Sequence, residues 1–247
     1  MEKRYLIITE YDGANYCGWQ RQKNGVSVQS VIEEKLSIIF GCRVTLHGSS
    51  RTDAGVSAYE QTAHFDVDTN IPPEKIPHAV NSLLPKDISI VGCKVVDDDF
   101  HARFSDKKKT YAYRLYISNV RRPLFDRERL WIKRILNIDA MREAAAYVEG
   151  TYDCKCFQKS GSPRVGTIRT VMSVKVICTE KDIVDIEITA KGFLYKMART
   201  IAGTLVYVGL NKLSPTDVLH AVQLCDKTKT GKTLPGEYLY LLKTEYV

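Results

Sequence analysis

One short loop of the sequence combines residue types that acid–base or nucleophilic chemistry uses. In "RTDAGV", residues 51–56, the carboxylate of Asp53 has Arg51 two positions before it and Gly55 two positions after it. Asp and Gly close together are typical of a tight turn, because Asp bonds to nearby backbone and Gly accepts a positive φ. A carboxylate presented by such a turn can also act as a nucleophile or a proton acceptor. The loop alone leaves both interpretations open.

The sequence matches none of the common motifs for phosphate binding, metal binding or hydrolase catalysis, because the residue spacing is wrong in each case. The segment "GKT" at Gly231 resembles the end of a phosphate-binding loop, but Asp226 stands where that loop needs Gly. The five histidines lack metal-binding spacing, and the seven cysteines form no C-x-x-C pair. No Ser or Cys stands in a G-x-S-x-G elbow. We therefore expect no metal, and Cys154 and Cys156 as ordinary side chains.

The distribution of charge favours a polyanionic partner. The 247 residues include 36 Lys and Arg against 29 Asp and Glu, a net charge of +7, with 44% hydrophobic residues. Basic residues cluster over residues 107–134, where Tyr, Phe and Trp are interleaved with them. Such interleaving suits the binding of phosphates and bases. Solvated strand and loop faces would show the same composition, so this signal leaves two interpretations.

The apolar stretches are too short for a membrane protein. No window approaches the roughly 18 uninterrupted apolar residues of a spanning helix, and the charged start "MEKR" does not lead into a signal sequence. We expect a soluble, cytoplasmic protein with no membrane partner and with reduced thiols.

Hydrophobic periodicity predicts a mixture of strands and helices. The expected strands are residues 4–11, 44–48, 59–67, 88–96, 109–117, 168–178, 183–190 and 238–245. The expected helices are residues 28–40 after Ser27, and then 73–84, 138–148, 195–208 and 214–224. The longest expected loop, residues 118–137, is rich in Arg, and loops of this length are often functional.

The order of these elements favours two α+β domains. Strands and helices do not alternate strictly enough for a doubly wound parallel sheet, so the sheets are expected to be mixed and largely antiparallel. A charged stretch at residues 97–108 separates the two sets of elements. We expect the domains to be residues 1–104 and 105–247.

Several ordered stretches together resemble the tRNA pseudouridine synthase A family. They are "YDGANYCGWQRQKNGVSVQSVIEEKL", "RTDAGV", "DFHARFSDKKKTYAY", "GFLYKMARTIAGTL" and the closing "GEYLYLLKTEY". The resemblance implies two α+β domains that face each other across a basic active-site cleft, a homodimer, and no metal or organic cofactor. It also implies isomerisation of uridine to pseudouridine in the anticodon stem-loop of tRNA, typically at positions 38 to 40.

The resemblance also implies roles for five residues. Breaking the N1–C1′ bond of uridine and rejoining the base through C5 needs an ionised carboxylate, which is Asp53. It acts as a nucleophile on one route or as a proton acceptor on another, and both stay open. Arg199 is expected to stabilise the anion, and Tyr111 to stack on the uracil. Arg51 is expected beside the flipped nucleotide, and Arg103 among the substrate contacts.

Two residues depart from the family pattern. Ser50 stands where the family usually has Gly, and Ser57 stands where it usually has His. Neither change touches Asp53, but both are compatible with a paralogue that has different target uridines. The sequence is also compatible with a non-catalytic RNA-binding protein on the same scaffold, or with a hydrolase of free nucleosides.

Overall fold

The computed structural model describes residues 2–105, 107–159, 166–180 and 182–246, which form two compact units. Unit 1 contains Met1–Lys107 and Leu241–Val247, and unit 2 contains Lys108–Tyr240. The last strand, β10 (Leu239–Tyr246), begins in unit 2 and ends in unit 1. Division of the chain into domains at residues 104 and 105 stays a prediction.

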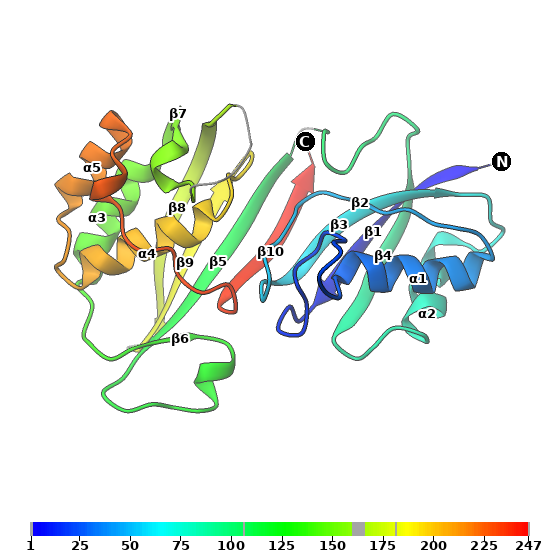
Figure 1. Cartoon of the computed structure of the whole chain (residues 1–247), viewed down its shortest axis with the longest axis horizontal. Coiled ribbons are helices and arrows are strands. Elements are labelled where there is room, and N and C mark those ends of the chain that lie inside the picture. Colours follow the sequence, from blue (N-terminus) through cyan, green and yellow to red (C-terminus); the bar gives the residue numbers. More distant parts are fainter. Residues whose placement is uncertain (1, 106, 160–165, 181, 247) are drawn as a thin grey trace. The chain divides into compact units, whose positions relative to one another are not determined.

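Unit 1 is an antiparallel sheet with α1 lying across one face (Figure 1). Its elements are β1 (Lys3–Tyr11), α1 (Val28–Phe40), β2 (His47–Gly48), β3 (Ser57–Val67), a 3-10 turn (Pro73–Lys75), α2 (Ile76–Asn81) and β4 (Ile88–Val96). Strand β1 pairs with both β3 and β4, and β2 pairs with β3. Tyr5 stacks on Phe65 across the β1–β3 pair with ring centroids 5.6 Å apart, and Phe40 of α1 covers Phe65 at 5.8 Å. These aromatic contacts join the helix to the sheet.

Helix α1 begins where its sequence predicts. Ser27 is the N-cap, and its side chain accepts from the N–H of Ser30 while the side chain of Ser30 accepts from the N–H of Ser27. Gly41 ends the helix with φ +65°, the left-handed conformation that a C-terminal glycine commonly adopts. The apolar residues Val28, Ile32 and Leu36 are fully buried, as the helical spacing predicts.

Unit 2 contains further strands, with helices packed against them. Its elements are β5 (Lys107–Ile117), a 3-10 turn (Phe125–Arg127), β6 (Leu130–Ile132), α3 (Ile138–Val148), β7 (Gly150–Asp153), a 3-10 turn (Cys154–Phe157), β8 (Ile168–Glu180), β9 (Ile183–Ala190), α4 (Met197–Gly209), α5 (Pro215–Leu224) and a 3-10 turn (Lys227–Lys229). The strand order is β5-β9-β8-β7, with antiparallel pairing, and β6 pairs with β5 in parallel. Helix α3 packs against α4, α5 and β8 (Figure 1).

Helix α4 is buried almost all round. Gly203 lies where a Cβ would come within 1.9 Å of the carbonyl of Lys232, so only glycine allows the returning chain to cross the helix there. Lys196 precedes the helix in a left-handed conformation, with φ 59°, which is uncommon for a residue with a side chain. The turn that leads into α4 is therefore held in one shape by its surroundings.

Three elements differ from the prediction. The expected helix 73–84 is a 3-10 turn followed by a short α2, which ends at Asn81; the side-chain amide of Asn81 exchanges two hydrogen bonds with the backbone of Ile90. The expected strand 44–48 is reduced to His47–Gly48. The expected loop 118–137 contains β6 and a 3-10 turn. The fold class itself, mixed α+β with largely antiparallel sheets, is confirmed.

The neighbouring thiols Cys154 and Cys156 belong to the core of unit 2. They are 0% and 1% exposed, and burial raises the pKa of Cys154 to about 11 and that of Cys156 to about 12. Both thiols therefore stay protonated at neutral pH, as expected of packing residues. Within the described ranges, no helix is both long enough and apolar enough to cross a membrane.

Candidate active site

The loop that carries Asp53 joins β2 to β3 in unit 1 and forms a β-turn. The N–H of Val56 donates to the carbonyl of Asp53 at 3.2 Å, which closes the four-residue turn. Gly55 has φ +79°, the value that the third residue of a type II turn requires. The turn interpretation is confirmed, and the partly buried Asp53 stands at the first position of the turn.

Thr52, the residue before Asp53, is held on two sides. Its hydroxyl shares a hydrogen bond of 2.8 Å with the hydroxyl of Tyr11, and its carbonyl accepts the N–H of Trp19 at 3.2 Å. All three residues are buried. Because both the side chain and the backbone of Thr52 are fixed, the attachment point of Asp53 has little freedom.

Two glycines let the chain of residues 11–19, here called the supporting segment, lie directly against this loop. A Cβ on Gly18 would lie 2.4 Å from the carbonyl oxygen of Thr52, and one on Gly13 would lie 2.1 Å from that of Val56. Gly18 also has φ +108°. Backbone therefore meets backbone at both places, and a larger residue at either would displace the loop.

Tyr16 anchors the supporting segment at its middle. Its hydroxyl donates to Asp87 at 2.7 Å, and burial together with this carboxylate raises the pKa of Tyr16 far above its usual value. The carbonyl of Tyr16 accepts the N–H of Gly55 at 3.3 Å. The turn after Asp53 is thus connected to the chain before β4.

Arg51 lies on the exposed side of the same loop. Its Nε donates to Oε1 of Gln20 at 3.1 Å, and Nε2 of Gln20 donates to Gln29 of α1 at 2.7 Å. The loop therefore carries both Arg51 and Asp53, and the bond to Gln20 gives the guanidinium a defined direction.

Arg103 lies elsewhere in unit 1, in a segment organised by three histidines whose rings are in contact. The ring centroid of His64 is 4.9 Å from that of His47 and 4.6 Å from that of His101. Nδ1 of His64 accepts the N–H of Ala102 at 3.1 Å, and Nδ1 of His101 accepts that of Arg103 at 3.1 Å. Burial, with the neighbouring histidines, lowers the pKa of His64 to about 4. His64 is therefore a neutral acceptor that fixes the backbone before Arg103.

Tyr111 is on β5 in unit 2, on the face that also carries Tyr113. It is 7% exposed, and Phe193 meets its ring edge to face with centroids 4.9 Å apart. Ala112 faces the other side of the strand, since side chains alternate. The ring of Tyr111 thus has a fixed orientation.

Arg199 lies on the first turn of α4 in the same unit. Its Nε donates to the carbonyl of Leu234 at 2.6 Å, and the N–H of Leu234 donates back to the carbonyl of Arg199 at 3.3 Å. Tyr113, two residues after Tyr111, donates its hydroxyl to the next carbonyl, that of Pro235, at 3.0 Å. Burial raises the pKa of Tyr113, and the charge of Arg199 opposes that effect. The two bonds place the guanidinium near the strand that carries Tyr111.

Each unit therefore holds a part of the predicted set. Unit 1 contains Arg51 and Asp53 on one loop and Arg103 in a separate segment, whereas Tyr111 and Arg199 belong to unit 2. In the part of the chain that the structure describes, no three His, Cys, Asp or Glu side chains are grouped as a metal ion would need.

Comparison with known proteins decides the family. A family model described as tRNA pseudouridine synthase matches residues 7–105 and 144–247, and these ranges include Asp53 and Arg199. The chain belongs to the tRNA pseudouridine synthase family. It is therefore an isomerase that forms pseudouridine in tRNA.

Curated relatives of this pseudouridine synthase match over its whole length. A tRNA pseudouridine synthase A from Thermoanaerobacter sp. (strain X514) is 46% identical, over 99% of this chain and 100% of the relative. One from Ruminiclostridium cellulolyticum is 41% identical over the same shares, and a "tRNA pseudouridine synthase A 2" from Clostridium tetani is 40% identical over 100% of both chains. A solved Cbf5-Nop10-Gar1 complex matches weakly, with a TM-score of 0.33 and 14% identity over 84% of this chain and 54% of that chain.

The supporting segment of this pseudouridine synthase has a role that the sequence patterns did not reveal. Tyr11, Gly13, Gly18 and Trp19 hold the loop of Asp53, and Asp87 holds Tyr16. The only signal was their presence in a stretch that resembles the family. No periodicity marks them, because their contacts join residues more than 30 positions apart.

Both departures from the family pattern are buried in unit 1. Ser57 is 7% exposed, and its hydroxyl oxygen accepts the N–H of Gly13 at 3.0 Å. Ser50 is 8% exposed, and its carbonyl accepts Nε2 of Gln61 at 2.9 Å. In this pseudouridine synthase, Ser57 therefore joins the supporting segment to the loop of Asp53.

Proposed function

We propose that the enzyme isomerises uridine in the anticodon stem-loop of tRNA, at positions 38 to 40, and that Asp53 is the catalytic carboxylate. The observation that carries this proposal is the set of hydrogen bonds that fixes the backbone of the loop on both sides of Asp53. Its turn is closed by Val56, and the residue before it is bonded by Tyr11 and Trp19. A carboxylate held in this way needs little reorganisation to meet a substrate, which is the main source of catalytic power in preorganised sites.

The chemistry rearranges one nucleotide. The N1–C1′ bond breaks, the uracil turns while it stays bound, and a C5–C1′ bond forms. C5 loses its hydrogen as a proton and N1 gains one, so the composition of the nucleotide is unchanged. Asp53 begins this sequence either by attacking as a nucleophile or by accepting a proton from the sugar, and both routes use its ionised form.

We assign the other four residues to binding and charge. Tyr111 offers an aromatic face of fixed orientation for stacking on the uracil. Arg199 is a cation that favours the ionised carboxylate. Arg51, exposed and directed by Gln20, is suited to a phosphate or to the space that a flipped base leaves. Arg103 is assigned to substrate contacts.

We also propose that the enzyme is a homodimer that works in the cytoplasm. Light scattering tests the first part: we expect twice the mass of one chain, and the mass of a single chain would refute it.

Chemical mapping of pseudouridine in an unmodified tRNA transcript tests the proposed target. We expect wild type to modify uridines at positions 38 to 40. Modification at different positions would favour a paralogue with its own target uridines. Tight binding without any pseudouridine would favour a non-catalytic RNA-binding protein, and release of uracil from free nucleosides would favour a hydrolase.

A further inference from the structure

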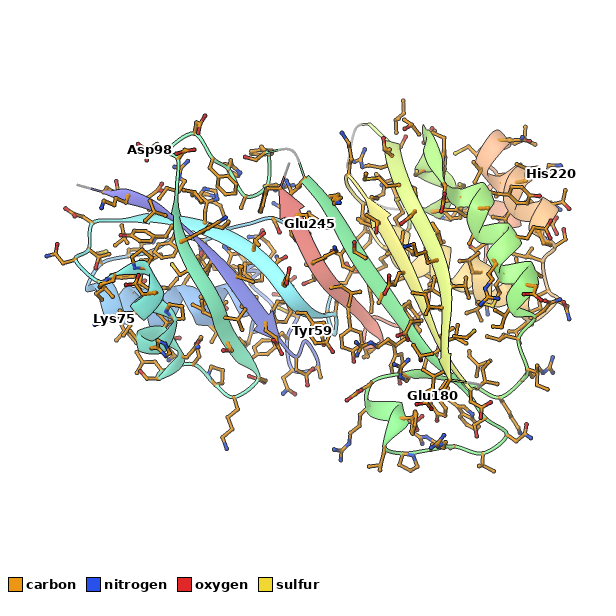
Figure 2. All side chains as sticks on the ribbon, turned by 180° about the vertical axis from the view of Figure 1, so that it is seen from behind. Tyr59, Lys75, Asp98, Glu180, His220 and Glu245 are labelled. Carbon is orange, nitrogen blue, oxygen red and sulfur yellow. The ribbon has the colours of Figure 1, made fainter. Side chains whose placement is uncertain are left out.

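The chain between β5 and α3, residues 118–137, is a cationic excursion from the sheet of unit 2. Figure 1 shows it as a separate loop around β6, and Figure 2 shows it from behind, beside Glu180 at the end of β8. It has six basic and two acidic residues: Arg121, Arg122, Arg127, Arg129, Lys133 and Arg134 against Asp126 and Glu128. None of the five residues with a proposed catalytic or substrate role belongs to it.

Specific bonds fix the excursion at its base. The hydroxyl of Tyr116 donates to Asp126 at 2.5 Å, and Nε of Arg121 pairs with the other oxygen of that carboxylate. These partners, Tyr116 first, lower the pKa of Asp126. The indole N–H of Trp131 donates to the carbonyl of Ser118 at 2.7 Å, which ties the start of the excursion to β6. The carboxylate of Asp126 is thus already paired with Tyr116 and Arg121.

The sheet provides a second anchor. Strand β6 pairs in parallel with the end of β5, and Arg129 bonds Asp185 of β9 at 2.5 Å with both side chains mostly buried. This pair neutralises one more arginine at the base. The excursion is therefore a fixed platform and not a loose tail.

The surface that this platform turns to solvent is strongly cationic. Arg122, Arg127, Lys133 and Arg134 are exposed, and Glu128 is the exposed acidic residue among residues 118–137. The guanidinium of Arg122 lies over the ring of Phe125, 3.9 Å from its centroid. A guanidinium supported by an aromatic ring loses less freedom when it binds a phosphate, because its plane is already oriented.

We propose that the excursion is a docking surface for the phosphates of tRNA outside the target nucleotide. The inference rests on the proposed function for its partner, tRNA. Tyr111, assigned to the target base, and the end of β5 are six residues apart on one strand, which corresponds to about 20 Å. The nucleotide that binds at Tyr111 and the phosphates that bind at the excursion would therefore belong to different parts of the same tRNA.

A second copy of the chain fits this surface less well. The exposed apolar residues Val120, Leu124 and Ile135, which are 69%, 79% and 88% exposed, would suit a protein partner as well as riboses and bases. In a twofold dimer centred on the excursion, however, the same patch comes from both subunits, so a cationic patch meets another cationic patch. Like charges brought together in this way oppose association, whereas phosphates complement them.

Equilibrium binding of tRNA separates this proposal from the proposed function, because the binding is measured without any turnover of uridine. The test variant is R122Q/R127Q/R134Q, and the matched control is K155Q/K175Q/K212Q, which removes the same charge from exposed lysines elsewhere in unit 2. A third variant, R122K/R127K/R134K, keeps the charges and changes the side chains. The Kd for tRNA is measured by fluorescence anisotropy over a range of salt concentrations.

Three lost phosphate contacts should lower the slope of log K against log salt by about 2 to 3 and weaken binding at low salt at least about tenfold. The lysine-for-arginine variant should keep most of the slope, and the control should bind as wild type does. A test variant with the slope of the control would overturn the proposal. A test variant that binds tRNA normally but becomes monomeric by light scattering would also overturn it and would assign the surface to a second copy.

Discussion

Replacing Gly18 with alanine should slow the reaction by moving the loop of Asp53. The new Cβ would lie 2.4 Å from the carbonyl oxygen of Thr52 and 3.0 Å from the carbonyl carbon of Asp53. Ordinary contact begins near 3.4 Å, so the loop must move by about 1 Å. A shift of about 1 Å in a catalytic group can cost about 100-fold in rate. We therefore expect kcat to fall about 100-fold in Gly18→Ala.

The strain of a positive φ must be separated from this displacement. Gly18 has φ +108°, and an alanine there adds a backbone penalty of about 1 to 2 kcal/mol. Gly41, with φ +65°, would take the same kind of penalty, but a Cβ there meets nothing within 4 Å. Gly41→Ala is thus the matched control, with a lower unfolding midpoint and an unchanged kcat.

The assay is single-turnover formation of pseudouridine in tRNA at a temperature where both variants are folded. If folded Gly18→Ala reacts within about threefold of Gly41→Ala, a difference under about 1 kcal/mol, then the position of this loop does not control the reaction. That result would refute the assignment of Asp53 and its support.

Two further predictions concern the stability of unit 1. Ser57→Ala removes the acceptor of the Gly13 N–H inside the protein, so the free energy of unfolding should fall by about 1 to 3 kcal/mol in denaturant titrations; no change would mean that the bond contributes nothing. His64 has a folded-state pKa of about 4, below its usual 6.5, because it is buried and faces His101, His47 and Arg4. The unfolded chain therefore binds a proton between these pH values and the folded chain does not, so stability should drop by about 2 to 3 kcal/mol as pH falls from 6.5 to 4. His64→Gln should reduce this slope, and an equal slope in the variant would contradict the buried, neutral histidine.

Local patterns were sufficient for most of the fold. Helix α1 follows directly from its apolar spacing, the Ser27 cap and the Gly41 stop, since all three signals act within the segment. Strands β1, β8 and β9 follow from their alternating or continuous apolar runs. The turn at Asp53 also follows from its Asp and Gly.

Elements that depend on distant partners could not be predicted in this way. The last residue of helix α2, Asn81, bonds the backbone of Ile90 through its side chain, and β6 exists because it pairs with the end of β5. The close approach of Gly18 to Thr52 joins parts of the chain 34 positions apart. No local pattern contains such information, and only the resemblance to a family pointed to the supporting segment.

The central claim, that Asp53 is the catalytic carboxylate, is tested most directly by release of tritium from C5 of uridine in tRNA. Each isomerisation frees one C5 hydrogen, so release counts turnovers. Asp53→Asn should release none above background while its Kd for tRNA stays within about threefold of wild type, a difference under about 1 kcal/mol. Asp98→Asn, at an exposed carboxylate of the same unit labelled in Figure 2, should react as wild type does. Tritium release by Asp53→Asn at the wild-type rate would contradict the claim.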